Sequence, residues 1–336
     1  MTSNPSAPLP YVVRRESRSR FVSVRGLRHH VLEWGDPTLA TPERPTLVMQ
    51  HGWMDVAASF QFVVDALSRD RHVIAFDWRG FGLTDAPPRA DTYWLPDYLG
   101  DLDAMLDALF FDAQKAVAPA STIDLLGHSM GGNVVMLYAG LRPERVRRLV
   151  NLEGFGMPAT KPSQAPKRYL QWLDELKTPA ELRRYDSLAA VAARLRKTNP
   201  RLPPQRADWL ARHWSREVTD AVTDAATDGL TVGSTGTPRF EILGDPAHKR
   251  ISPTLYQRDE ALEVWKLIEA PLLWVEGDQT ELERWWGTRY TKAEFHERLN
   301  VVRNVEREVL APAGHMLHHD QPEALARRLE RFLDPD

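Results

Sequence analysis

The chain has 336 residues, of which 43% are hydrophobic, and its formal net charge is -3. A chain of this length and composition can bury the core of one large or two medium domains. Its balanced charge gives no indication of binding to nucleic acid or to an anionic membrane surface. The sequence contains no cysteine, which excludes disulfides, a cysteine nucleophile and thiolate metal ligands.

The N-terminal end of the chain is polar. Residues 1–18 (MTSNPSAPLPYVVRRESR) lack the apolar segment of a signal peptide, and we interpret them as a partly disordered lead-in. Since no apolar run reaches 18 residues, no membrane-spanning helix is predicted. These features favour a cytoplasmic location without stable insertion into a membrane.

Predicted strands and helices alternate over residues 19–158. This alternation is typical of a mostly parallel sheet with helices on both faces, whose active residues lie at the carboxyl ends of the strands. A turn at Gly26 predicts a hairpin between the first two strands. We expect strands at 21–24, 30–34, 45–50, 72–76, 123–126 and 146–152, and helices at 57–68, 102–109 and 132–138.

A serine flanked by glycines lies between the strand predicted at 123–126 and the helix that follows it. Gly127, Ser129 and Gly131 form G-x-S-x-G, and in this context the pattern is typical of a nucleophile elbow. Such a sharp turn needs small residues around the serine and lifts its hydroxyl clear of the sheet. The serine then lies at a helix N-terminus, where free N–H groups favour a developing oxyanion. Ser129 is therefore the candidate nucleophile.

A His-Gly pair at positions 51 and 52 directly follows the strand predicted at 45–50. In a hydrolase, this loop would lend a backbone N–H to an oxyanion hole, here that of Trp53. The second N–H would come from Met130, the residue after the nucleophile. The alternative is an ordinary turn between a strand and a helix.

The segment 76–85 (FDWRGFGLTD) contains a second glycine pattern. It lacks the third glycine of a dinucleotide-binding loop, and no helix pattern begins there. We interpret Asp77 and Arg79 as polar residues that brace the loop, and we predict no cofactor.

The strand pattern stops over residues 159–270, a segment rich in helix formers, proline and polar residues. Apolar residues at helical spacing predict helices around 188–195, with Ser187 as N-cap, around 207–214 and at 260–269, whereas 240–253 looks irregular. An insertion of this length is a small helical domain rather than a loop. Strands at 271–276 and 305–310 and a last helix over 325–333 complete the pattern in residues 271–336.

A serine hydroxyl needs a base, and His315 is the candidate. It lies in a glycine-containing loop after the last predicted strand, at the edge of the sheet where Ser129 emerges. His318 and His319 follow near a helix start, and we interpret them as surface or rim residues. A metal site is not predicted, because no carboxylate–histidine spacing supports one.

The base in turn needs an acid that fixes its tautomer. The loop after the strand at 271–276 offers Glu276 and Asp278, and the loop after the strand at 146–152 offers Glu153. Glu153 stands at the strand end before Gly-Phe-Gly, the better local context. Any of these carboxylates can also be an ordinary solvated acid, so position alone leaves the choice open.

Five segments together resemble the α/β-hydrolase superfamily over most of the chain. The HGWMD and DPAHKRISP segments further resemble the serine hydrolase-like group within it. The resemblance implies the α/β-hydrolase fold, with a core formed by 19–158 and 271–336 and a helical cap domain at 159–270. The superfamily segments are HGWMD (51–55), FDWRGFGLTD (76–85), GHSMGG (127–132), NLEGFGMP (151–158) and APAGHMLHHDQPE (311–323).

The resemblance also implies a triad in the order serine, acid, histidine. Most relatives carry the acid in a G-x-x-D loop after the seventh strand, where this chain has Thr280. Relatives that lack this aspartate, including some haloalkane dehalogenases, place the acid after the preceding strand, which favours Glu153 over Asp278. The cap would shape the substrate pocket, with Trp53, Met130 and Phe155 at its floor. For Phe155, core packing is the alternative.

We therefore expect a cofactor-free serine hydrolase that acts on a small-molecule ester or related acyl bond. Relatives with an aspartate nucleophile, the haloalkane dehalogenases and epoxide hydrolases, are disfavoured by Ser129. One alternative is another reaction of this fold with the same serine and histidine, such as hydrolysis of a carbon–carbon bond. A non-catalytic binding protein is a third reading, because a fold by itself does not prove function.

Overall fold

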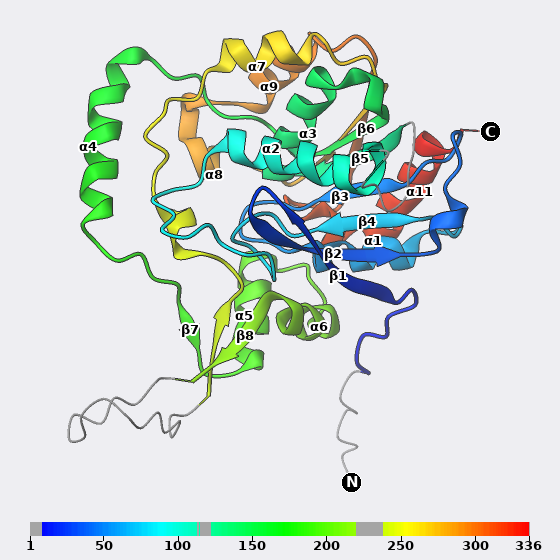
Figure 1. Ribbon diagram of the computed structural model, residues 1–336, viewed down its shortest axis with the longest axis horizontal. Coiled ribbons are helices and arrows are strands. Elements are labelled where there is room, and N and C mark those ends of the chain that lie inside the picture. Colours follow the sequence, from blue (N-terminus) through cyan, green and yellow to red (C-terminus); the bar gives the residue numbers. More distant parts are fainter. Residues whose placement is uncertain (1–8, 113, 115–121, 220–237, 336) are drawn as a thin grey trace.

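A computed structural model describes residues 9–112, 114, 122–219 and 238–335 (Figure 1). Its centre is an eight-stranded sheet in the order β1-β2-β4-β3-β5-β6-β10-β11. β1 and β2 form the expected hairpin, β2 pairs antiparallel with β4, and the remaining neighbours are parallel. The strands are β1 (Ser17–Val24), β2 (Leu27–Trp34), β3 (Leu47–Gln50), β4 (Val73–Phe76), β5 (Ile123–His128), β6 (Val146–Leu152), β10 (Leu272–Gly277) and β11 (Val305–Leu310).

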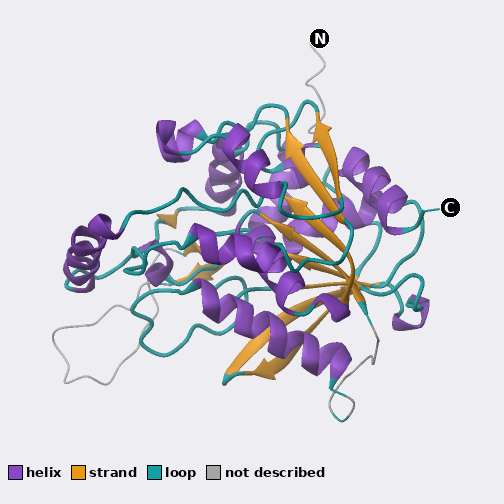
Figure 2. Ribbon diagram, turned by 90° about the horizontal axis from the view of Figure 1, so that it is seen from above, coloured by secondary structure: helices purple, strands orange, loops and turns teal. Residues whose placement is uncertain are grey.

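Helices cover both faces of this sheet (Figure 2). Parallel strands need crossover connections, which are usually helices, and a sheet covered on both faces has strands that are apolar throughout. Accordingly, successive residues of one strand enter opposite cores: Val48 packs in one cluster, and Leu47 and Met49 pack in the other. The predicted α/β-hydrolase architecture of the core is confirmed. The helices around the sheet are α1 (Gln61–Ala66), α2 (Leu95–Leu106), α3 (Met130–Leu141), α7 (Arg258–Trp265), α8 (Glu283–Trp286), α9 (Lys292–Leu299), α10 (Leu317–Asp320) and α11 (Pro322–Leu333).

The segment 159–270 contains helices and also a second sheet. Ser187 caps a helix as predicted, because its side chain accepts a hydrogen bond from the Ala190 N–H at 3.1 Å. The prediction of an irregular stretch at 240–253 is wrong at its start, where a strand pairs with two others in a three-stranded antiparallel sheet. Strands of two to four residues are too short to show an alternation in the sequence. The elements are α4 (Ala165–Leu176), β7 (Arg184–Tyr185), α5 (Leu188–Thr198), α6 (Pro204–Trp214), β8 (Ser215–Val218) and β9 (Arg239–Ile242).

Short helical turns complete the connections. Among them, η2 leads directly into α1, so the helix expected at 57–68 begins with a tighter turn. Every helix in the described parts of the chain is too short or too polar to cross a lipid bilayer. The turns are η1 (Pro37–Leu39), η2 (Ala57–Phe60), η3 (Asp107–Phe111, a π-helix), η4 (Pro143–Arg145), η5 (Pro162–Gln164), η6 (Pro246–Lys249) and η7 (Gly287–Arg289).

The lead-in predicted at residues 1–18 is shorter in the structure. Residues 1–8 lie outside the described residues, whereas Ser17 and Arg18 already belong to β1. Tyr11 packs edge-on against Phe62 and Trp209, with ring centroids 5.1 and 5.6 Å away. This aromatic contact is long-range in sequence, so the sequence pattern around Tyr11 does not reveal it.

Candidate active site

Ser129 lies at the sharp turn between β5 and α3. Its φ of +53° is in the left-handed region, which a non-glycine residue adopts only under local constraint. A Cβ at Gly127 would lie 2.4 Å from the Gly131 carbonyl oxygen, and one at Gly131 would lie 2.4 Å from the Gln50 carbonyl oxygen. Both approaches are too close for any side chain. The glycines on either side of the serine are therefore required by the turn, as the motif predicted.

The structure brings Ser129, His315 and Glu153 into one hydrogen-bonded chain. His315 Nε2 lies 3.0 Å from Ser129 Oγ, and His315 Nδ1 lies 2.7 Å from Glu153 Oε2. The Glu153 side chain is fully buried, and its second carboxylate oxygen accepts a hydrogen bond from the Gly277 N–H at 2.6 Å. Glu153 also has a left-handed φ of +55°, another locally strained position at a strand end.

The competing carboxylates have other partners. Asp278 is exposed and accepts a hydrogen bond from the Ala313 N–H at 2.8 Å. Glu276 accepts one from the indole of Trp274 at 3.1 Å and lies 3.2 Å from His296. Asp278 thus holds the loop that carries His315 without touching the imidazole, whereas Glu153 contacts the ring itself.

Two backbone N–H groups near Ser129 in the chain fold are the candidates for an oxyanion hole. Gly52 lies against the serine, since a Cβ there would be 3.1 Å from Ser129 Cβ, and Trp53 follows it. Met130 is the first residue of α3, where helical N–H groups have no intrahelical partner. Within the described residues, neither the Trp53 nor the Met130 N–H donates a backbone hydrogen bond. The oxyanion hole expected from these two residues is thus compatible with the geometry.

The aromatic residues near the site divide into buried and exposed ones. Phe155 is 2% exposed and packs against Trp274 and Phe295, with ring centroids 5.0 and 5.1 Å away, which favours its alternative reading as core. Trp53 is 52% exposed. Trp285, which sequence reasoning missed, is 45% exposed, and its ring lies edge-on to His315 at 4.5 Å. The available signal in the sequence is the pair of adjacent tryptophans, Trp285 and Trp286, soon after the loop that follows β10.

The interpretation of His318 and His319 as surface or rim residues is wrong. The two residues are 0% and 2% exposed, and their rings pack against Phe60 and Phe62, each with centroids 5.5 Å apart. α10 turns them inward beneath the His315 loop. Burial disfavours the charged imidazolium and lowers the pKa of His319 to about 3.

Asp77 and Arg79 brace loops, as the sequence predicted. The Asp77 carboxylate accepts hydrogen bonds from the Ala57 N–H at 2.7 Å and from the Leu83 N–H at 3.0 Å. Arg79 donates to the buried carboxylate of Asp101 at 2.6 Å. These contacts tie the loop after β4 to neighbouring elements and leave no free carboxylate there for catalysis.

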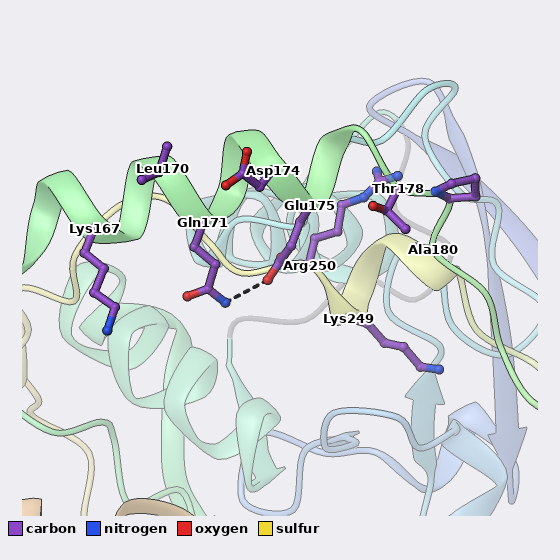
Figure 3. A pocket seen from close by; sticks show the side chains of 10 residues that line it. Lys167, Leu170, Gln171, Asp174, Glu175, Thr178, Ala180, Lys249 and Arg250 are labelled. Carbon is purple, nitrogen blue, oxygen red and sulfur yellow. Dashed lines mark hydrogen bonds between the residues drawn. The ribbon is translucent and has the colours of Figure 1, made fainter.

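A hollow of about 660 Å³ lies beside α4 (Figure 3). Charged and polar residues contribute to its lining, and Gln171 donates a hydrogen bond to Glu175, one turn further along α4, at 2.7 Å. None of Ser129, Glu153 and His315 lines it. The lining residues are Lys167, Leu170, Gln171, Asp174, Glu175, Thr178, Pro179, Ala180, Lys249 and Arg250.

Comparison with known proteins agrees with this fold. A family described as alpha/beta hydrolase fold matches residues 45–322, and the chain belongs to this family. A serine hydrolase-like protein of Danio rerio is 30% identical over 186 residues, 52% of each chain. A serine hydrolase-like protein of Dictyostelium discoideum is 22% identical over 289 residues, 84% of this chain and 73% of the relative. This chain thus spans about half the length of the first relative.

A solved structure has a similar fold over nearly the whole chain. The thioesterase domain from the curacin biosynthetic pathway superposes with a TM-score of 0.71 over 94% of this chain and 99% of that domain, at 22% identity. Identity at this level shows a shared fold. Membership of the alpha/beta hydrolase fold family supports an enzyme.

Proposed function

We propose that this protein is a serine hydrolase that cleaves an ester or related acyl bond of a small molecule through an acyl-enzyme intermediate. The observation that carries the proposal is the continuous chain from Ser129 Oγ to His315 at 3.0 Å and from His315 to Glu153 at 2.7 Å. A serine hydroxyl becomes a competent nucleophile when a base within hydrogen-bond reach is itself oriented by an acid.

In the proposed reaction, Ser129 Oγ attacks the substrate carbonyl while His315 Nε2 takes the hydroxyl proton. The buried carboxylate of Glu153 holds Nδ1–H and stabilises the imidazolium that forms. The N–H groups of Trp53 and Met130 hold the oxyanion. His315 then gives its proton to the leaving alcohol. Water, activated by the same imidazole, releases the acyl group and regenerates the serine. Each of these steps uses groups of this chain and water.

The segment 159–270 supplies the proposed cap. Along the chain, this segment lies between β6 and β10, two strands that pair with each other in the central sheet. Helix α4 has no buried residue, and it exposes Tyr169 by 48% and Leu173 by 49%. An exposed apolar face of this kind is suited to contact an acyl chain or other apolar substrate group. We therefore place substrate selection on this segment.

The proposal is tested with the Ser129→Ala variant. We expect it to lose hydrolysis of short p-nitrophenyl esters and covalent labelling by a fluorophosphonate, because both need the serine oxygen. Undiminished labelling of the folded variant would remove the assignment. A parallel panel of esters and vinylogous diketones separates ester hydrolysis from carbon–carbon bond hydrolysis with the same serine.

A further inference from the structure

Three ligand-type side chains from separate segments of the chain meet in the interior near Ser129. Asp55 follows β3, His128 ends β5, and His318 lies in α10. The three residues are 5%, 2% and 0% exposed. One side-chain nitrogen or oxygen atom of each lies within 4.8 Å of the other two. The ligands are far apart along the chain, which is why their spacing in the sequence does not reveal a site.

His128 has one ring nitrogen with an unshared electron pair. Its Nε2 lies 2.8 Å from the carbonyl oxygen of His315, and a carbonyl only accepts, so Nε2 carries the proton. Nδ1 of the neutral ring is then an acceptor, and it has no hydrogen-bond partner among the described residues. A histidine that donates one ring N–H to a backbone carbonyl and leaves the other nitrogen free is typical of metal ligands.

The other two side chains are also unsatisfied on the side that faces the cluster. Asp55 Oδ1 accepts hydrogen bonds from the Val56 N–H at 2.9 Å and from the Ser59 hydroxyl. Asp55 Oδ2 and both ring nitrogens of His318 have no hydrogen-bond partner within the described part of the chain. Oδ2 and His318 Nε2 are 3.8 Å apart. Buried polar atoms without partners are costly, so their concentration here calls for an occupant.

We propose that Asp55, His128 and His318 bind a divalent transition-metal ion such as Zn²⁺. Two imidazole nitrogens and one carboxylate oxygen suit zinc and its neighbours, whereas calcium and magnesium prefer oxygen ligands. Ligand atoms around tetrahedral zinc are about 3.4 Å apart. The observed spread of up to 4.8 Å therefore requires an inward shift of roughly 1.5 Å or less, which small side-chain rotations supply.

The ion would link the three segments of the chain that also carry proposed catalytic groups. Asp55 stands two residues after Trp53, His128 directly precedes Ser129, and His318 stands three residues after His315. None of the ligands belongs to the Ser129–His315–Glu153 chain. The metal site is thus structural in its effect, and it does not depend on the proposed hydrolysis.

The test uses the full chain without a histidine tag, stripped with a chelator and titrated with Co²⁺ and Zn²⁺. We expect one ion per chain by calorimetry, a visible Co²⁺ spectrum of low coordination number, and a rise of several degrees in the thermal midpoint. His318→Gln and Asp55→Asn should each weaken binding more than tenfold. Absence of stoichiometric binding to the wild-type chain would overturn the proposal, and water would then fill the cluster.

Two control variants locate the ion. His296→Gln, at a partly exposed histidine beside Glu276, should keep wild-type affinity. His315→Gln should keep it as well; if it abolishes binding while His318→Gln does not, the ion sits on the catalytic chain and the proposal is wrong. Ser129→Ala should bind metal normally while it lacks hydrolysis, which separates this inference from the proposed function. Should His318→Gln not fold, Asp55→Asn and the wild-type titration decide.

Discussion

The central sheet and helix α4 of the segment 159–270 bury their side chains very differently. Every residue of β3, β5 and β10 is buried, whereas α4 buries none and stands apart from the sheet (Figure 1). Ser129 and Glu153 follow strands that are buried at their carboxyl ends, where packing allows one arrangement. The exposed apolar residues lie where few contacts constrain the chain. The comparison therefore distinguishes the central sheet, which holds the proposed catalytic groups in one arrangement, from α4, whose exposed side chains can adjust to a substrate.

An aromatic stack is one of the contacts that join the segment 159–270 to the core. The ring of His248, from η6 in the segment, stacks between Phe81 and Tyr93 of the core, with centroid distances of 3.7 and 3.5 Å. Its Nδ1 also lies 3.1 Å from the Tyr98 hydroxyl. This stack is an anchor whose strength should depend on the charge of the imidazole.

The largest expected effect concerns the acid at the edge of the sheet. Glu153→Gln should lower kcat by about 10³- to 10⁴-fold, because the imidazole loses the partner that fixes its tautomer. Asp278→Asn should cost less than about tenfold, since Asp278 contacts the Ala313 N–H instead of the ring. Steady-state kinetics with a p-nitrophenyl ester measures both. The reverse ranking would assign the acid to Asp278.

The second prediction compares a leucine-to-alanine substitution in the central sheet with the same substitution in α4. Leu149→Ala in β6, at a fully buried position, should lower the free energy of unfolding by about 2–5 kcal/mol. Leu173→Ala in α4, at a position 49% exposed, should change it by less than about 0.5 kcal/mol. Urea unfolding followed by circular dichroism gives both values. A cost at Leu173 as large as that at Leu149 would mean that α4 is packed in solution.

The third prediction concerns the stack that joins the regions. Burial lowers the pKa of His248 from 6.5 to about 3. Between these two pH values, the His248 imidazole therefore binds a proton in the unfolded chain but not in the folded chain. The free energy of unfolding should therefore fall as the pH drops below about 6.5, with a contribution near 2 kcal/mol by pH 5, and stay level above it. His248→Asn should flatten this slope in thermal melts between pH 7.5 and pH 5. An unchanged slope would assign the loss to other groups.

The smallest expected effect tests substrate contact with α4. Leu173→Ala should raise KM for long-chain p-nitrophenyl esters by about fivefold, the loss of roughly 1 kcal/mol of apolar contact. KM for the acetate ester should stay the same, because a two-carbon acyl group has no chain to reach α4. Equal KM values for wild type and variant along the whole ester series would place chain-length selection elsewhere.

Position alone left the acid open, and only the family resemblance favoured Glu153. The sequence by itself determined the strands of the core, the serine turn and the candidate base. These follow from short-range physics: apolar runs make buried strands, and the turn at Ser129 needs Gly127 and Gly131 within two residues of it. The Ser187 cap was predictable for the same local reason.

Only the tertiary structure decided features whose partners are distant along the chain. In the tertiary structure, His318 and His319 are buried and Trp285 lies against His315. Phe155 packs in the core, and β9 pairs with β7 and β8. No local pattern encodes these contacts, because each depends on which surface another loop presents. The convergence of Asp55, His128 and His318 is of the same kind, because these residues belong to distant segments that become neighbours only in the folded chain.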